Sequence, residues 1–241
     1  MLALLVGYAL AEELPEMLNG NGSPIRWPSM PIEFKVDPTN EGGLDPERAV
    51  VAVAQGSGAW NDIPDSGVKI QFMGTGSGFT LAHDDVNGVS FLADWPGDPD
   101  ALAVTSVWST GAGTAVGFDM QINTADHAWG NDGAKDDADL QGAMAHEFGH
   151  VLGIGHLEKN PEATMYPTAV DGETHKRDLS DDDRWVAMNF YPPVEGGPPE
   201  RRSPFGPLCA TAGGPIATLP VIGGILLASL TARRRRASES A

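Results

Sequence analysis

Short segments in which apolar and polar residues alternate recur through the first half of the chain. In residues 31–36 the order Pro-Ile-Glu-Phe-Lys-Val places every second side chain on the same face, which is typical of a half-buried strand. Glycine, proline and aspartate follow such segments and favour turns between them. The pattern predicts strands over residues 31–36, 68–72, 89–92, 102–107 and 116–122.

Three further segments carry helix signals. Asp45 and Pro46 are favoured as an N-cap and as a first helical residue, ahead of a helix predicted over residues 48–60. A second helix is predicted over residues 138–153. A third follows Ser180, whose hydroxyl precedes three acids that suit the positive end of a helix dipole. This order predicts an α+β fold, a twisted mixed sheet of about five strands with three main helices.

The second predicted helix carries the most specific chemical pattern in the chain, His146-Glu147-Phe-Gly-His150-Val-Leu-Gly153-Ile-Gly-His156. His146 and His150 are one turn apart, so both imidazoles can reach one tetrahedral zinc ion. Gly153 allows the helix to end in a left-handed turn, after which His156 can supply a third ligand. Three protein ligands and a fourth position for water indicate a catalytic zinc, because structural zinc is closed by four ligands. Glu147 points about 100° away from His146 and can hold a water on the metal without binding the ion.

This eleven-residue pattern resembles that of the metzincin zinc endopeptidases, which also need a Met-containing turn beneath the metal. The segment Thr164-Met165-Tyr166-Pro167 supplies such a turn. Methionine followed directly by Tyr-Pro is similar to the matrixins, the matrix-metalloproteinase-like peptidases of family M10. The resemblance implies that Met165 forms a hydrophobic floor under the zinc.

The resemblance extends beyond the metal motif. Residues 139–141 resemble the segment ahead of the motif in bacterial matrixins, and residues 179–192 resemble the matrixin C-terminal helix. It covers residues 25–192 and is most specific from residue 139. It therefore implies a metzincin-like catalytic domain of bacterial matrixin type.

The resemblance also implies how peptide substrates bind. Leu102 and Ala103 lie in the segment that matches the matrixin edge strand, which would take up an extended substrate as an additional strand. Residues 167–174 would form the wall of the pocket beyond the scissile bond, and Tyr166 and Pro167 are candidate substrate-binding residues. The implied partner is a protein or peptide substrate.

The mechanism expected from these residues is peptide-bond hydrolysis. Zinc would lower the pKa of a bound water toward ~7, and Glu147 would accept its proton and pass it to the leaving amine. Two alternatives stay open: an exported zinc-containing surface module that adheres without turnover, and a zinc hydrolase of another bond. The variant Glu147→Ala distinguishes the first alternative from a protease. In a protease it should remove turnover and leave the zinc content intact.

Several positions depart from the matrixin pattern. Val104 and Gly117 stand where matrixins keep histidines for a structural zinc, so one catalytic zinc is expected and a second is not. Leu157 replaces a serine, and a hydrogen bond from this position to the Met-turn is expected to be lost. No cysteine precedes the domain, so no cysteine switch is expected. The remaining histidines are expected to be ordinary exposed residues: His83, His127 and His175.

The charge balance restricts which kinds of partner the chain can bind. The 241 residues contain 15 Lys+Arg and 33 Asp+Glu, a net charge of -18 that disfavours nucleic acid. Calcium is a further candidate cofactor, because acids and amides cluster around Asp84, Asp119 and residues 126–139. No calcium ligand set is predicted, since no loop has EF-hand spacing. A monomer is expected.

Both ends have the composition of targeting segments. An apolar start with Ala9-x-Ala11 resembles a signal peptide without its basic region. Near the other end, an apolar span over residues 215–232 runs into four arginines, which predicts a membrane anchor. With Cys209 ahead of it, this tail resembles the bacterial MYXO-CTERM sorting tails and implies export to the cell surface. The predicted units are residues 1–11 (signal peptide), 12–24 (leader), 25–192 (metallopeptidase domain), 193–208 (Pro/Gly-rich linker) and 209–241 (sorting or anchor tail).

Overall fold

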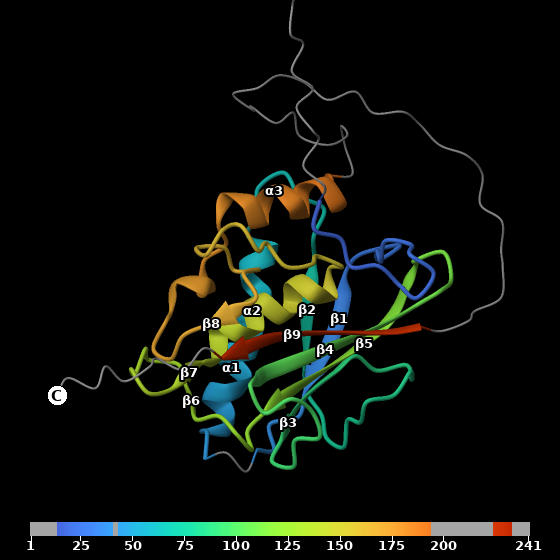
Figure 1. Ribbon diagram of the computed structural model, residues 1–241. Coiled ribbons are helices and arrows are strands. Elements are labelled where there is room, and N and C mark those ends of the chain that lie inside the picture. The colour runs from blue at the N-terminus through green and yellow to red at the C-terminus, as the bar shows by residue number, and fades with distance from the viewer. Residues whose placement is uncertain (1–13, 41–42, 194–223, 233–241) are drawn as a thin grey trace, which may run out of the picture.

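The computed structural model describes residues 14–40, 43–193 and 224–232. These ranges form a mixed seven-stranded sheet, a two-stranded sheet and three α-helices (Figure 1). The helices are α1 (Pro46–Asn61), α2 (Leu140–Val151) and α3 (Asp181–Phe190), with a short 3-10 helix at His175–Arg177. The strands are β1 (Ile32–Val36), β2 (Ile70–Thr75), β3 (Gly88–Leu92), β4 (Ala101–Ser109), β5 (Ala115–Asn123), β6 (Trp129–Gly130), β7 (Ala138–Asp139), β8 (Thr168–Ala169) and β9 (Gly224–Ala232).

The large sheet has the order β2-β1-β3-β5-β4-β9-β8. Strands β2, β1, β3 and β5 pair in parallel, and β4 pairs antiparallel with β5. Strand β9 is antiparallel to β4, and β8 is parallel to β9. The β4 strand thus lies between a neighbour from the middle of the chain and one from its C-terminal part.

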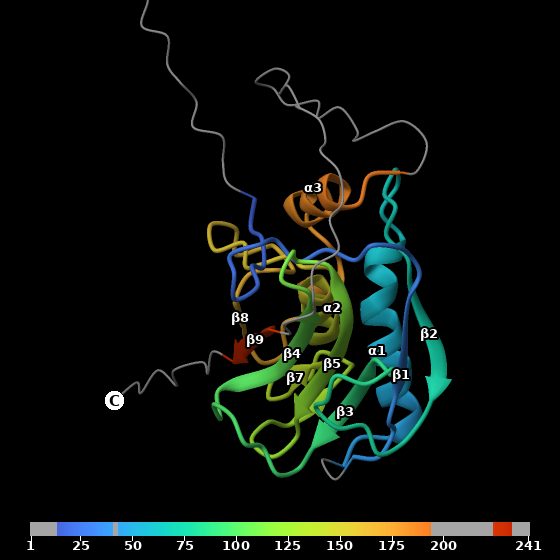
Figure 2. The same cartoon turned by 90° about the vertical axis from the view of Figure 1, so that its right-hand side faces the viewer.

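Helices α1 and α2 pack against each other beside the sheet (Figure 2). The indole Nε1 of Trp60 on α1 donates to the Ala145 carbonyl on α2 at 2.8 Å. On the sheet side, the Phe148 ring lies 4.8 Å from the Phe34 ring and 6.2 Å from the Phe118 ring, measured between centroids. These buried contacts place α2 rigidly against the sheet.

The predicted α+β fold is confirmed, and the predicted strands and helices occur in the predicted order, although the large sheet has seven strands rather than about five. Asp45 caps α1 and accepts a hydrogen bond from the Arg48 amide at 2.9 Å. Ser180 caps α3 and shares a capping box with Asp183. The short strands β6, β7 and β8 were not predicted, because two-residue pairings leave no periodic pattern in a sequence.

The predicted membrane helix is not supported. Its described part is strand β9, and none of the helices in the described ranges combines the length and apolar character needed to cross a membrane. Without β9 the outer side of β4 would be a row of unpaired backbone groups, and the apolar segment satisfies them by adding a strand. The other half of the predicted span, residues 215–223, lies outside the described residues.

The predicted leader is partly described, and it packs on the domain. The Met17 amide donates to the Gly153 carbonyl at 3.0 Å, and the Met17 carbonyl accepts from the Ile25 amide at 2.9 Å. The predicted signal peptide, the linker and Cys209 lie outside the described residues. Export therefore stays a prediction.

Candidate active site

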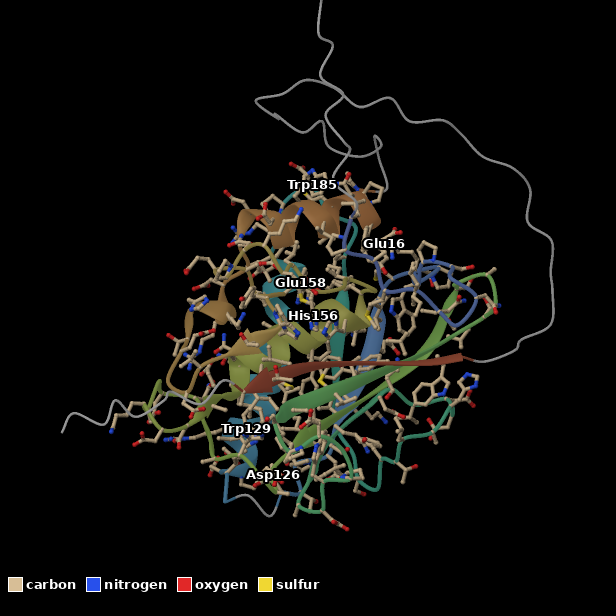
Figure 3. The ribbon with its side chains drawn as sticks, in the orientation of Figure 1. Glu16, Asp126, Trp129, His156, Glu158 and Trp185 are labelled. Atoms are coloured by element: carbon tan, nitrogen blue, oxygen red, sulfur yellow. The ribbon has the colours of Figure 1, made fainter. Side chains whose placement is uncertain are left out.

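Three imidazoles meet at the end of α2. His146 and His150 are 0% and 1% exposed, and their Nε2 atoms lie 3.0 Å apart. His156 comes from the loop after the helix (Figure 3). One nitrogen from each ring lies within 4.8 Å of the others, a spacing that a single metal ion can bridge.

The outer ring nitrogens of the two helical histidines are held by backbone carbonyls. His146 Nδ1 lies 2.7 Å from the Thr164 carbonyl, and His150 Nδ1 lies 2.8 Å from the Ile154 carbonyl. A carbonyl can only accept, so each Nδ1 carries the hydrogen and each Nε2 keeps its lone pair toward the other ring. The donor set therefore fits a zinc ion.

Burial also keeps these rings neutral. Desolvation lowers the pKa of His150 to about 3 and, together with the two neighbouring histidines, lowers the pKa of His146 well below its ordinary value. Neutral imidazole is the form that binds a metal. Near neutral pH these two residues are therefore ready to act as ligands.

Two glycines explain the local backbone. Gly153 has φ +76°, and a Cβ there would lie 2.1 Å from the Ile25 carbonyl oxygen. It ends α2 and turns the chain toward His156, as predicted. Gly149 lies where a Cβ would come within 2.2 Å of the Met165 sulfur. A side chain at Gly149 would displace the methionine from beneath the helix.

The predicted Met-turn lies against α2 beside the histidines, since the Thr164 carbonyl contacts His146 and the Met165 sulfur lies next to Gly149. Met165 is fully buried. Its amide and the Thr164 amide donate to the two carboxylate oxygens of Asp183, at 3.0 and 2.8 Å. The amide of Leu157 donates to the Met165 carbonyl at 2.9 Å. The expected loss of a hydrogen bond from position 157 is therefore wrong, because the backbone supplies a bond that does not depend on the side chain.

A buried lysine supports the same turn. Lys176 is 2% exposed, and its Nζ donates to the carbonyls of Ala163 at 2.9 Å and Tyr166 at 3.2 Å. Burial lowers the pKa of Lys176, while the neighbouring acids, Glu173 first, oppose that shift. Asp183 and Lys176 thus hold the turn from its amide side and from its carbonyl side.

Glu147 is buried beside the histidines. Its Oε2 accepts a hydrogen bond from the Thr105 hydroxyl at 2.6 Å, and its Oε1 accepts one from the Leu230 amide at 3.0 Å. Burial raises the pKa of Glu147 to about 7, although these hydrogen bonds favour the carboxylate. The carboxyl group lies between α2, β4 and β9.

The residues predicted to bind substrate lie around β9. Leu102 and Ala103 are buried in β4, and Ala103 is the register partner of Leu230. The Pro167 carbonyl accepts a hydrogen bond from the Thr231 amide at 3.2 Å. Tyr166, next to it, is half-buried. The two predicted sides of a substrate site, Ala103 and Pro167, therefore both contact β9.

The part of the chain that carries this geometry also matches known proteins. Residues 93–192 match the matrixin family model, Peptidase_M10. Human Matrilysin is 37% identical over 105 residues, which make up 44% of this chain and 36% of that protein. The chain thus spans about a third of the length of this relative. Both matches support a matrixin-type catalytic domain in this region.

The described part of the chain also bears on the expectation of a single metal centre. Among the described residues, the three histidines are the only group of three or more His, Cys, Asp or Glu that could hold an ion. His83 is exposed and stacks on Trp108 with ring centroids 6.0 Å apart. His175 is exposed as expected, whereas His127 is half-buried, contrary to the prediction. Calcium binding stays a prediction without assigned ligands.

Sequence reasoning missed how three residues support the site: Thr105, which it placed only in the substrate-binding strand, Lys176 and Asp183. Thr105 follows the predicted substrate-binding positions by two residues, so alternation places it on the same face as Ala103. Asp183 was predicted only as a helix-capping acid. Strand alternation and helix capping do not show that the Thr105 and Asp183 side chains contact residues far away in the sequence. Those contacts depend on how α2, α3 and the sheet pack.

Proposed function

We propose that the chain is a zinc-dependent endopeptidase that cleaves extended peptide segments bound between β4 and β8. The observation that carries this proposal is the position of Glu147, buried between the three-histidine group and a paired backbone strand. A carboxylate at that point faces both a metal-ligand set and a peptide amide. The matches to the matrixin model and to Matrilysin support the same activity.

His146, His150 and His156 are the proposed ligands. Zinc bound to them would supply a Lewis acid and a water of lowered pKa. The Thr164 and Ile154 carbonyls orient the two helical rings through their Nδ1 hydrogens. Met165 fills the space beneath the rings and limits their movement by packing, since a thioether is a weak donor beside three imidazoles.

Glu147 is the proposed general base. Its carboxylate takes a proton from the attacking water and returns it to the nitrogen of the scissile bond. Thr105 acts as a positioning residue, because its hydroxyl holds one carboxylate oxygen and leaves the other directed at the substrate strand. The raised pKa of Glu147 brings the group close to neutral pH, where both giving and taking a proton are accessible.

Backbone pairing supplies most of the proposed substrate affinity. A peptide in the place of β9 would pair antiparallel with β4 and would donate to the Pro167 carbonyl. Such β-strand addition depends on main-chain groups and makes few demands on sequence. Extended segments of proteins are therefore the proposed substrate class.

The test is a peptide-library digest by the full chain loaded with one zinc ion, with peptide in large excess. We expect cleavage that a chelator removes and that added zinc restores. Glu147→Ala should retain zinc and fold but lose turnover. Retained zinc without cleavage of any library peptide would contradict this proposal and favour a surface-binding module.

A further inference from the structure

Strand β9 occupies the place proposed for a substrate. It pairs antiparallel with β4 from Ser109↔Gly224 to Ala101↔Thr231, and it pairs in parallel with β8 through its last two residues. Figure 1 shows this strand, in red, between the labels of β8 and β4. The substrate position is therefore filled by the chain's own C-terminal segment.

The hydrogen bonds locate one peptide bond at the proposed general base. The Leu230 amide donates to Glu147 Oε1 at 3.0 Å, and the next two amides donate to opposite sides of the site. Thr231 donates to the Pro167 carbonyl at 3.2 Å, and Ala232 donates to the Asp100 carbonyl at 2.8 Å. The amide nitrogen that faces Glu147 is the one in the Ser229–Leu230 bond.

The Leu230 side chain, which follows that bond, is also buried in the domain. Leu230 is 0% exposed and belongs to the hydrophobic core of the domain. Removing a leucine side chain from water favours binding of the segment that carries it. Together with the amide contacts, this burial fixes the register of β9 at Leu230 rather than one residue to either side, since a one-residue shift would turn the side chain to the opposite face.

We propose that the Ser229–Leu230 bond is a self-cleavage site and that the enzyme's own C-terminal segment is a substrate. This inference rests on the endopeptidase function proposed above. Water adds to the Ser229 carbonyl carbon as the C–N bond breaks. Glu147 transfers a water proton to the Leu230 nitrogen. The products are a carboxylate at Ser229 and a free amine at Leu230.

Cleavage has two consequences for the chain. It releases residues 230–241, which include Arg233 to Arg236 and one acid, Glu239. It also separates the Leu230, Thr231 and Ala232 anchors from the rest of β9. The shortened strand then holds the site less firmly, and other extended peptides gain access to it.

The test uses the full chain, purified with a chelator present and then loaded with zinc. Intact-mass spectrometry should show loss of residues 230–241, with a first-order rate constant that does not change on dilution. Glu147→Gln should stay intact. Thr231→Pro removes the amide that donates to Pro167 and should slow cleavage at least roughly fivefold. The matched variant Ala237→Pro, beyond the described strand, should be cleaved at the original rate.

An external peptide in the same sample separates the two proposals. If that peptide is cleaved while the Ser229–Leu230 bond stays intact, self-cleavage is overturned and the endopeptidase function stands. Cleavage at another bond of the tail, or a rate constant that rises with protein concentration, would also overturn the proposal. If neither the peptide nor the tail is cleaved, the endopeptidase function itself is overturned.

Discussion

Helix α2 and strand β9 meet at Glu147, yet they depend on different kinds of interaction. The helix has its own signals, an Asp139 N-cap that accepts from the Gly142 amide at 2.8 Å and a glycine at its end. Strand β9 consists of an apolar segment whose own pattern predicts a membrane helix, and its pairing partner lies more than 100 residues earlier. A helix that carries a candidate metal motif can thus be identified locally, whereas a bound strand is defined by the edge that receives it.

The two elements also differ in how firmly the rest of the protein holds them. The α2 residues are held by the core on several sides, through contacts with α1, the sheet and the Met-turn. The β9 residues are held by pairing along β4, by two residue pairs with β8 and by the contacts of Leu230 at its end. We therefore expect changes on α2 to affect catalysis and folding, and changes on β9 to affect occupancy of the site.

The largest effect is expected at Glu147. Glu147→Gln keeps the shape of the side chain but cannot accept the proton, so kcat for an external peptide should fall by about 10²–10⁴. Zinc content and the thermal unfolding transition should stay close to those of the parent chain. A variant with more than a tenth of the parent kcat would show that α2 does not supply the general base.

The next effect concerns the metal. His156→Ala removes one of three ligands and should reduce bound zinc well below one per chain, as measured by elemental analysis after dialysis. His83→Ala is the matched control, because His83 is exposed and stacks on Trp108. Equal zinc contents in the two variants would show that the loop after α2 does not complete the site.

A stability comparison tests the two regions directly. Phe148→Ala on α2 should lower the free energy of unfolding by about 3–5 kcal/mol, the usual range for a buried aromatic ring. Leu230→Ala on β9 should cost less than about 2 kcal/mol, although both side chains are fully buried. The reason is that β9 can detach while the domain stays folded. Equal losses in urea denaturation would make β9 an integral part of the core.

The support of the Met-turn gives a smaller change. Asp183→Ala leaves the Thr164 and Met165 amides without their carboxylate partner and removes a helix-cap contact, so we expect a loss of about 2–4 kcal/mol in unfolding free energy. Asp181→Ala in the same helical turn is the control, because its carboxylate is exposed. If both variants lost similar stability, the effect would come from helix charge rather than from the turn.

The smallest change is expected at Met165. Leucine preserves its volume and apolar character, so Met165→Leu should cost less than about 1.5 kcal/mol and leave most of the activity. A polar substitution should be more damaging at this fully buried position. Loss of zinc from a folded Met165→Leu variant would indicate sulfur coordination instead of packing.

The features predicted from sequence were those with local causes. The alternation in 31–36, the caps Asp45 and Ser180, and the histidine spacing on α2 all depend on residues a few positions apart. The support of Glu147 by Thr105 could not be predicted in this way. It requires β4 and α2 to pack face to face, which no local pattern specifies.

The amino-acid sequence by itself determined which side chains can bind a metal and which helix carries them, because helical spacing and capping operate within one or two turns. Only the tertiary structure decided that Asp183 and Lys176 hold the Met-turn and that Gly224–Ala232 is a strand. The physical reason is that an apolar segment satisfies its backbone groups wherever partners are available. Here the partners are the free edge of β4 and the carboxylate of Glu147.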